Sequence, residues 1–169
     1  MAAKLALEST LSANQFEVDR KSTLILNEKW IRNFRDILSA YFESAFNIYR
    51  TSMAYINISA SSTAAQPVDM LVELNGYKSK IINLKSKLAL FLNDNQEKEY
   101  DILTKIINFN SWLLNLTDLD DPDVEDIVSK HISLEGEILN NAQQIIRGTL
   151  SSIFTKGEEE KITSTINQS

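Results

Sequence analysis

The sequence predicts an all-α protein, an up-down antiparallel four-helix bundle with a long, protruding first helix. Only four glycines and two prolines occur in 169 residues, which leaves too few turn signals for an all-β or α/β chain. Apolar residues recur at steps of three and four over long stretches, as they do on one face of a helix. Short polar segments separate these stretches, and amphipathic helices joined in this way pack as a bundle.

The first predicted helix covers residues 3–57, because nothing between Ala3 and Asn57 stops a helix. At 1.5 Å per residue this helix is roughly 75–80 Å long. Its apolar face follows steps of three and four. The members of that face are Phe34, Ile37, Leu38, Tyr41, Phe42, Ala45, Ile48, Tyr49, Met53 and Ile56.

The second predicted helix covers residues 68–92 and follows the loop "NISASSTAAQP". Gly76 is its weak point, because Asn-Gly favours positive φ and a glycine costs about 1 kcal/mol in a helix interior. A kink or a fresh start near Lys78 is therefore expected. The apolar face comprises Val68, Leu71, Val72, Ile81, Leu84, Leu88 and Phe91.

The third predicted helix covers residues 95–116, after a capping-box pattern of Asp94 and Glu97. Its apolar residues are Tyr100, Leu103, Ile106, Ile107, Phe109, Leu113, Leu114 and Leu116. The fourth covers residues 122–155, with Asp121 as the N-cap and Pro122 at the first position. Its face comprises Val124, Ile127, Val128, His131, Leu134, Ile138, Ala142, Ile145 and Ile153. Close approach of a neighbouring helix would offset the low helix propensity of Gly136 and Gly148.

We expect one helical domain over residues 1–157 and a flexible tail over residues 158–169, where "EEEKITSTINQS" has few large apolar groups. The second and third helices span only about 30–38 Å, so the first must extend beyond them. Its N-terminal half would then expose Leu7, Leu11 and Phe16, which favours a partner chain or a membrane surface.

The composition disfavours several classes of function. A net charge of −6 argues against nucleic-acid binding, which needs a surplus of Lys and Arg. Without cysteine there is no disulfide, thiolate zinc site or cysteine nucleophile, and an intracellular, cytoplasmic location is the simplest interpretation. The longest apolar run, "LALFL", is far shorter than the roughly 20 residues of a membrane span.

His131 is the only histidine, and therefore the only side chain that ordinarily titrates near neutral pH. Its place on an apolar stripe favours a structural role over a catalytic one. A di-iron site of the Glu-x-x-His type would need Glu where Val128 stands. "DLDDPD" does not match a calcium loop, because counting from Asp118 the fifth position is Pro122 and the twelfth is Ser129. We expect no metal and no cofactor.

Two surface patterns are candidates for interaction. Lys78, Lys80, Lys85 and Lys87 form a basic run on the second helix, which is either a solvated face or a contact with anionic headgroups or with the acidic fourth helix. The segment "KWIRNFRD" gathers Trp30, Arg32 and Arg35. Such a group suits a membrane interface, and it equally suits a packing seam with paired arginines. The expected interaction surface comprises Leu7, Leu11, Phe16, Trp30, Arg32 and Arg35.

Over roughly residues 27–158 the chain resembles a group of small, uncharacterised bacterial membrane-anchored helical-bundle proteins. The resemblance rests on "EKWIRNFRDILSAYF", "LKSKLALFLNDNQEKEYDIL" and "IIRGTLSSIFTKGE". Trp30, Ile31 and Arg35 match the Trp-Ile-x-x-hydrophobic-Arg motif of the group, which has no assigned activity. The resemblance implies a cytosolic helical region behind an N-terminal membrane span. This sequence has "MAAKLALESTLSANQ" in place of the span and lacks a late Glu-Trp motif.

The sequence therefore predicts a non-enzymatic interaction or structural module that self-associates, or binds a protein partner, through its first helix. A membrane surface is a further expected partner. The alternative is a small-ligand binder or an enzyme that uses Arg32, Arg35 and His131. A charge-lined cavity joining those three residues would favour the alternative.

Overall fold

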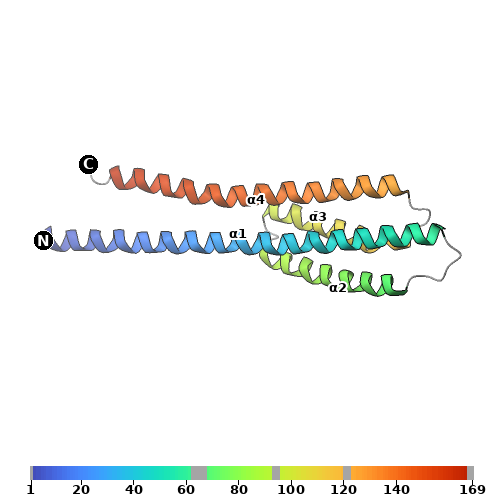
Figure 1. Ribbon diagram of the computed structural model, residues 1–169. Coiled ribbons are helices and arrows are strands. Elements are labelled where there is room, and N and C mark those ends of the chain that lie inside the picture. The colour runs from blue at the N-terminus through green and yellow to red at the C-terminus, as the bar shows by residue number, and fades with distance from the viewer. Residues whose placement is uncertain (1, 62–67, 93–95, 120–122, 167–169) are drawn as a thin grey trace. The chain divides into compact units, whose positions relative to one another are not determined.

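Over the residues that it describes, the computed structural model is all-α, as predicted, with four α-helices and one short 3-10 helix (Figure 1). It describes residues 2–61, 68–92, 96–119 and 123–166, with helical backbone but no side-chain detail for residues 2–14, 16, 20, 60, 61 and 152–166. The described residues contain no strand. In chain order the elements are α1 (Ala2–Ser61), α2 (Val68–Phe91), α3 (Glu97–Leu114), η1 (Leu116–Asp118) and α4 (Val124–Ile166).

The chain divides into two compact units. Residues 34–145, here called the bundle unit, contain α2, α3, η1, most of the second half of α1 and the first half of α4. Residues 1–33 and 146–169 form the terminal unit. Within the bundle unit successive helices run in alternating directions, which is the up-down arrangement (Figure 1). The protrusion of the first helix and a single domain over residues 1–157 stay predictions.

The helix bounds differ from the predicted ones mainly at the C-terminus. The fourth helix continues to Ile166 instead of ending near Thr155. Glu and Lys, which follow Gly157, are good helix formers, and one glycine costs only about 1 kcal/mol. Most of the predicted tail is therefore helical, and its flexibility stays a prediction.

The start of α4 is capped two residues later than predicted, by Asp123. Asp123 accepts hydrogen bonds at Oδ1 from the backbone N–H groups of Glu125 (2.9 Å) and Asp126 (3.5 Å). This is the geometry of an N-cap, which satisfies amide donors that the first turn leaves unpaired. The predicted caps Asp94 and Asp121 lie outside the described residues. For α3 the N-cap residue is Gln96, whose side chain makes no capping bond.

The core of the bundle unit is built from all four helices and η1. Tyr41, Phe34 and Phe109 are the largest of its fully buried side chains. Each helix contributes residues at steps of three and four, so burial follows the helical period. The buried apolar side chains are Phe34, Leu38, Tyr41, Ala45, Ile48, Leu74, Ile81, Leu84, Leu88, Leu92, Ile102, Ile106, Phe109, Leu113, Leu116, Ile127, Ile138, Ala142 and Ile145.

Six residues that the sequence assigned to apolar faces are exposed instead. They are Val68, Val72, Tyr100, Ile107, Val124 and Val128. In α2, Leu74 is buried in the core, although the apolar spacing had not singled it out. Steps of three and four identify a helix, but a helix with apolar residues on two sides satisfies that rule in more than one way. Packing decided which side is buried.

Two polar contacts join α3 to α1 and α2 within the bundle unit. The Tyr41 hydroxyl donates to the backbone carbonyl of Ile106 at 3.3 Å, and this contact joins α1 to α3. The Lys78 ammonium donates to the carbonyl of Leu114 at 2.7 Å, which joins α2 to the end of α3. A helix leaves its last carbonyls without intrahelical partners, so a lysine there satisfies an otherwise open acceptor.

The second helix is continuous through Gly76, so the predicted fresh start near Lys78 is wrong. Gly76 is exposed, and a Cβ built there would meet nothing within 4 Å. The same is true of Gly136 and Gly148 in α4, so no close helix approach accounts for these glycines. The surrounding helix formers and the buried face of α2 outweigh the loss of propensity at one position.

We expect Gly76→Ala to raise the free energy of unfolding by about 1 kcal/mol, because alanine restricts the unfolded chain and fits the helix without a clash. The midpoint of urea denaturation measures the gain. Ser79→Ala, also exposed on α2, serves as the control and should give a smaller increase, about half as large. A lower midpoint for Gly76→Ala would show that position 76 leaves the helical conformation in solution.

Candidate functional site

His131 lies at the centre of an aromatic cluster formed by three helices of the bundle unit. Its ring stacks on Tyr49 of α1, with centroids 4.2 Å apart and planes inclined by 11°. Two rings of α3 stack beside it, Phe109 at 5.5 Å and Trp112 at 6.2 Å. The ammonium of Lys130 lies 5.8 Å from the centroid of the Trp112 ring, within reach of a cation–π interaction. Here the His131 cluster means His131, Tyr49, Phe109 and Trp112.

Burial lowers the pKa of His131 below its usual value of 6.5. Removing the imidazolium from water disfavours the charged form. Glu135, one turn along α4, opposes the shift, because its Oε2 lies 3.7 Å from His131 Nε2. The burial effect is the larger of the two. The ring is therefore held mainly neutral near pH 7.

Three buried polar atoms of the bundle unit have no hydrogen-bond partner among the described residues: Ser52 Oγ, Asn110 Oδ1 and His131 Nδ1. A buried polar group without a partner typically costs about 1–3 kcal/mol. A general base must come within hydrogen-bond reach of the proton that it abstracts from the substrate. His131 is buried against flat aromatic rings instead, so the cluster suits packing rather than proton transfer to a substrate.

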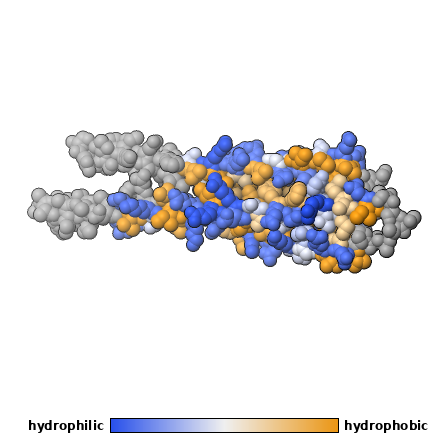
Figure 2. All heavy atoms as spheres, viewed as in Figure 1, coloured by the Kyte–Doolittle hydropathy of each residue, from blue (hydrophilic) through white to orange (hydrophobic). Residues whose placement is uncertain are grey.

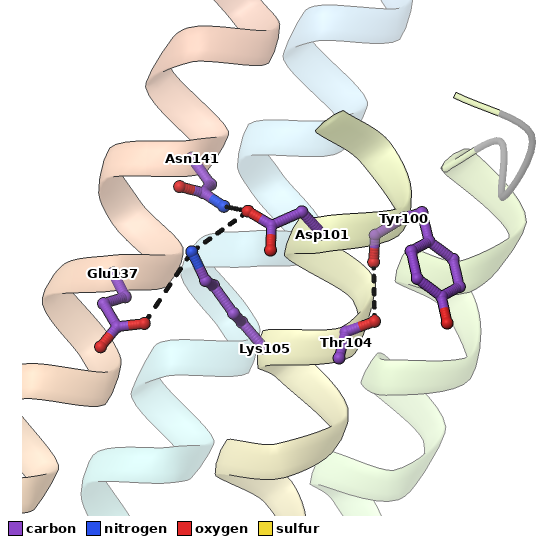
Figure 3. A network of polar contacts seen from close by, with 6 residues as sticks. All are labelled: Tyr100, Asp101, Thr104, Lys105, Glu137 and Asn141. Carbon is purple, nitrogen blue, oxygen red and sulfur yellow. Dashed lines mark hydrogen bonds and ion pairs between the residues drawn. The ribbon is translucent and has the colours of Figure 1, made fainter. Parts of the chain in front are cut away.

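A second polar group joins α3 to α4 at the surface of the bundle unit (Figure 3). The Lys105 ammonium lies 3.1 Å from Asp101 Oδ2 and 3.8 Å from Glu137 Oε2. The amide of Asn141 donates to the same oxygen of Asp101. Figure 3 shows Glu137 and Asn141 pointing from α4 toward the α3 pair. Partly exposed pairs of this kind add little stability, but they favour one register of the two helices.

The predicted interaction surface is only partly described. Leu7, Leu11 and Phe16 belong to α1, and their side chains lie outside the described residues. Trp30 is half-buried, whereas Arg32 and Arg35 are exposed. The two arginines are thus available to solvent. Neither is buried in a packing seam.

Of the alternative site, Arg35 and His131 belong to the bundle unit, and they are not brought together there. His131 stacks on Tyr49, and Arg35 precedes Tyr49 by fourteen residues of one continuous helix, about 21 Å at 1.5 Å per residue. An arginine side chain cannot span that distance, so Arg35 and His131 do not meet within the bundle unit.

The predicted interaction surface did not include a group of exposed apolar side chains on α1. Val18, Ile25 and Leu26 expose 57%, 63% and 65% of their surface. Isolated apolar residues on a surface are ordinary, but three on adjoining turns of one helix form a patch that favours a partner. The spacing of Val18 and Ile25, seven residues apart, could have revealed it.

Among the described residues, no three His, Asp or Glu side chains converge where a metal ion could bind. Over the same residues, no helix carries an apolar stretch long enough to cross a bilayer. Comparisons of the chain with known protein families, with curated proteins and with solved structures found no match.

Proposed function

We propose that this protein is a non-enzymatic helical-bundle module that self-associates through its first helix. The observation that carries the proposal is the apolar patch of Val18, Ile25 and Leu26 on α1, here called the α1 patch. Val18 and Ile25 are two turns apart and so lie on the same face, with Leu26 beside them. Apolar surface of this kind on a helix is buried when a second helix packs against it.

The polar residues around the α1 patch favour a protein over a membrane as its binding partner. Arg32 follows Ile25 by seven residues, so it extends the same line, and it is exposed. Between residues 17 and 36 five basic residues stand against four acidic ones. A nearly balanced charge offers little general attraction to an anionic membrane, which needs a cluster of Lys and Arg. A rim of mixed charges around apolar residues is typical of protein interfaces.

The His131 cluster supports the non-enzymatic part of the proposal. The one histidine is enclosed by aromatic rings, and its nearest charged neighbour is Glu135 on the same helix. The cluster stabilises the bundle unit through stacked rings from three helices.

The test uses the paired substitution Ile25→Glu and Leu26→Glu. Both side chains are exposed, so the helix should fold, whereas two buried carboxylates would oppose association. We expect the wild-type chain to sediment as an oligomer, and we expect the variant to associate at least about tenfold more weakly, which corresponds to about 1.4 kcal/mol. Analytical ultracentrifugation over a range of concentrations measures both.

Ile132→Glu is the matched control, because Ile132 on α4 is 65% exposed, as Leu26 is. It should leave the mass unchanged. A wild-type monomer at every concentration, or an equal loss with the control, would contradict the proposal. Co-sedimentation with vesicles that contain anionic lipid, abolished by the α1 variant while the protein stays monomeric, would assign the patch to a membrane surface instead.

A further inference from the structure

We infer that three pairs of opposite charges, each with one residue on α1 and one on α2, set the register and the face with which α2 packs on α1. These six residues, here called the charge ladder, are Asp36, Glu43 and Arg50 of α1 and Lys87, Lys80 and Glu73 of α2. All six are exposed and belong to the bundle unit. None of them belongs to the α1 patch, so the charge ladder is independent of the proposed self-association.

The ladder residues have the same spacing on both helices. Each helix contributes three residues at steps of seven, and seven residues are almost two turns, so each set forms a line along one side of its helix. From start to end the charges of the α1 line are acidic, acidic and basic, whereas those of the α2 line are acidic, basic and basic. The two helices run in opposite directions (Figure 1). In that orientation one register sets every acid of one line opposite a base of the other.

The surroundings of Tyr77 show that the two lines lie beside one another. Tyr77 follows Glu73 by one turn of α2, and its hydroxyl donates a hydrogen bond to Glu73 Oε1 at 2.9 Å. This bond raises the pKa of Tyr77, and two charges of α1 also act on it, because Arg50 lowers the pKa and Glu43 raises it. Charges near a protein surface act over only about 10 Å at ordinary salt concentrations. The Glu73 end of the α2 line is therefore near the Arg50 end of the α1 line.

Two hydrogen bonds to α3 lead independently to nearly the same register. The Tyr41 hydroxyl of α1 donates to the carbonyl of Ile106, and the Lys78 ammonium of α2 donates to the carbonyl of Leu114. Because α1 and α3 run in the same direction (Figure 1), the distance between these carbonyls places Lys78 about two turns beyond Tyr41. The ladder places Lys78 opposite Ala45, one turn beyond Tyr41. The difference of one turn, about 5.4 Å, is less than the combined reach of a lysine and a tyrosine side chain.

Only this register pairs all three charges favourably. It sets Asp36 opposite Lys87, Glu43 opposite Lys80, and Arg50 opposite Glu73. A shift of α2 by seven residues in one direction keeps one attractive pair and sets Glu43 opposite Glu73. The same shift in the other direction keeps one attractive pair and sets Arg50 opposite Lys80. An exposed ion pair adds little stability, but like charges disfavour both alternatives, so the ladder contributes specificity.

The ladder also distinguishes the two apolar sides of α2. One side carries Leu74 and Ile81, which are buried, and the outer side carries Val72 and Ile82, which expose 66% and 45% of their surface. Figure 2 shows hydrophobic residues at the surface where α2 begins. Apolar spacing alone therefore leaves the choice of side open. Turning α2 about its axis to bury Val72 would carry the α2 line away from α1, so the ladder favours burial of the Leu74 side.

The experiment exchanges the central pair, Glu43 and Lys80, which have no charged residue three or four positions away on their own helices. Glu43→Lys and Lys80→Glu should each raise the equilibrium constant for unfolding about fivefold, because like charges then face one another. The double variant should return to within about twofold of the wild type, because opposite charges face one another again. Urea denaturation of the full chain, at low salt and at one protein concentration, measures the constant.

Glu43→Lys with Lys87→Glu is the matched control. It makes the same exchange of charges on the same two helices, but Lys87 lies almost two turns from the position that faces Glu43. The losses of its two single variants should add, to about twentyfold in all, without recovery. A second control is salt. In about 1 M sodium chloride, where the screening length is about 3 Å, each single variant should lie within about twofold of the wild type.

Recovery in the central pair alone, and its disappearance at high salt, would confirm the register. Single variants that unfold like the wild type would overturn the ladder. A central double variant as unstable as its two single losses combined, or an equal recovery in the control, would overturn it too. None of these substitutions changes the α1 patch, so a monomeric wild type would contradict the proposed function and leave the ladder standing.

Discussion

Replacing Phe109 with alanine is expected to lower the free energy of unfolding by about 3–5 kcal/mol, the usual range for a fully buried phenylalanine. Phe109 has no exposed surface. Its ring lies 6.4 Å from that of Tyr41, 6.0 Å from that of Trp112 and 5.5 Å from that of His131. Truncation removes a shared neighbour of all three rings and leaves a cavity that rigid helices fill only in part.

Urea denaturation followed by circular dichroism measures this loss, with Ile107→Ala as the control on the same helix. Ile107 is 46% exposed, so its truncation should cost less than about 1 kcal/mol. Near-ultraviolet circular dichroism reports separately on the ordered aromatic rings and should weaken in the Phe109 variant alone. Equal losses at the two positions would show that the His131 cluster is not a centre of packing.

Stability is expected to fall as the pH drops below about 6.5, because His131 is buried in the folded chain. The folded state holds the pKa of His131 below the value of 6.5 that the unfolded chain has. The unfolded state therefore binds a proton first, and protonation favours unfolding. The contribution of the neutral ring is fully present above pH 6.5 and is lost as the pH falls from there to the folded-state pKa. Each unit of pKa difference corresponds to about 1.4 kcal/mol.

The charged group near the His131 ring does not reverse the direction of this pH dependence. Glu135 faces it from α4 and favours the proton, but burial is the stronger effect. The Lys130 ammonium lies over the Trp112 ring, 5.8 Å from its centroid. From α1 and α3 the rings of Tyr49 and Phe109 cover His131.

His131→Phe isolates this contribution, because phenylalanine keeps a flat ring in the stack and cannot titrate. The free energy of unfolding, measured from pH 7.5 to pH 5, should fall in the wild type and stay nearly level in the variant. That window lies above the range in which carboxylates ordinarily titrate. Parallel curves for the two proteins would show that His131 is accessible to protons in the folded state.

The helices and their approximate bounds follow from local signals in the sequence. The long first helix was predictable because no proline and no cluster of turn residues interrupts residues 3–57. The start of the fourth helix was predictable to within two residues, since several acids precede its apolar run, although the cap is Asp123 and the predicted Asp121 lies outside the described residues. The break at Gly76 was wrong, because propensity at one position is a weak effect beside the burial of a whole face.

The contacts of the candidate site could not be predicted in the same way. Tyr49 and Phe109 were placed on helix faces, but nothing local indicates that both would stack on His131. Contacts across 80 residues depend on the register in which helices pack, and side-chain spacing along one helix carries no information about its axial position relative to another. The separation of Arg35 from His131 follows from the same register.

The sequence by itself determined that this chain is helical, because periodicity, caps and scarce breakers act over a few neighbouring residues. Only the tertiary structure decided that in α2 Leu74 faces the core and Val72 faces solvent, the reverse of what the apolar spacing predicts. Burial depends on which surfaces the neighbouring helices present, and the spacing of residues along one helix carries no information about those surfaces.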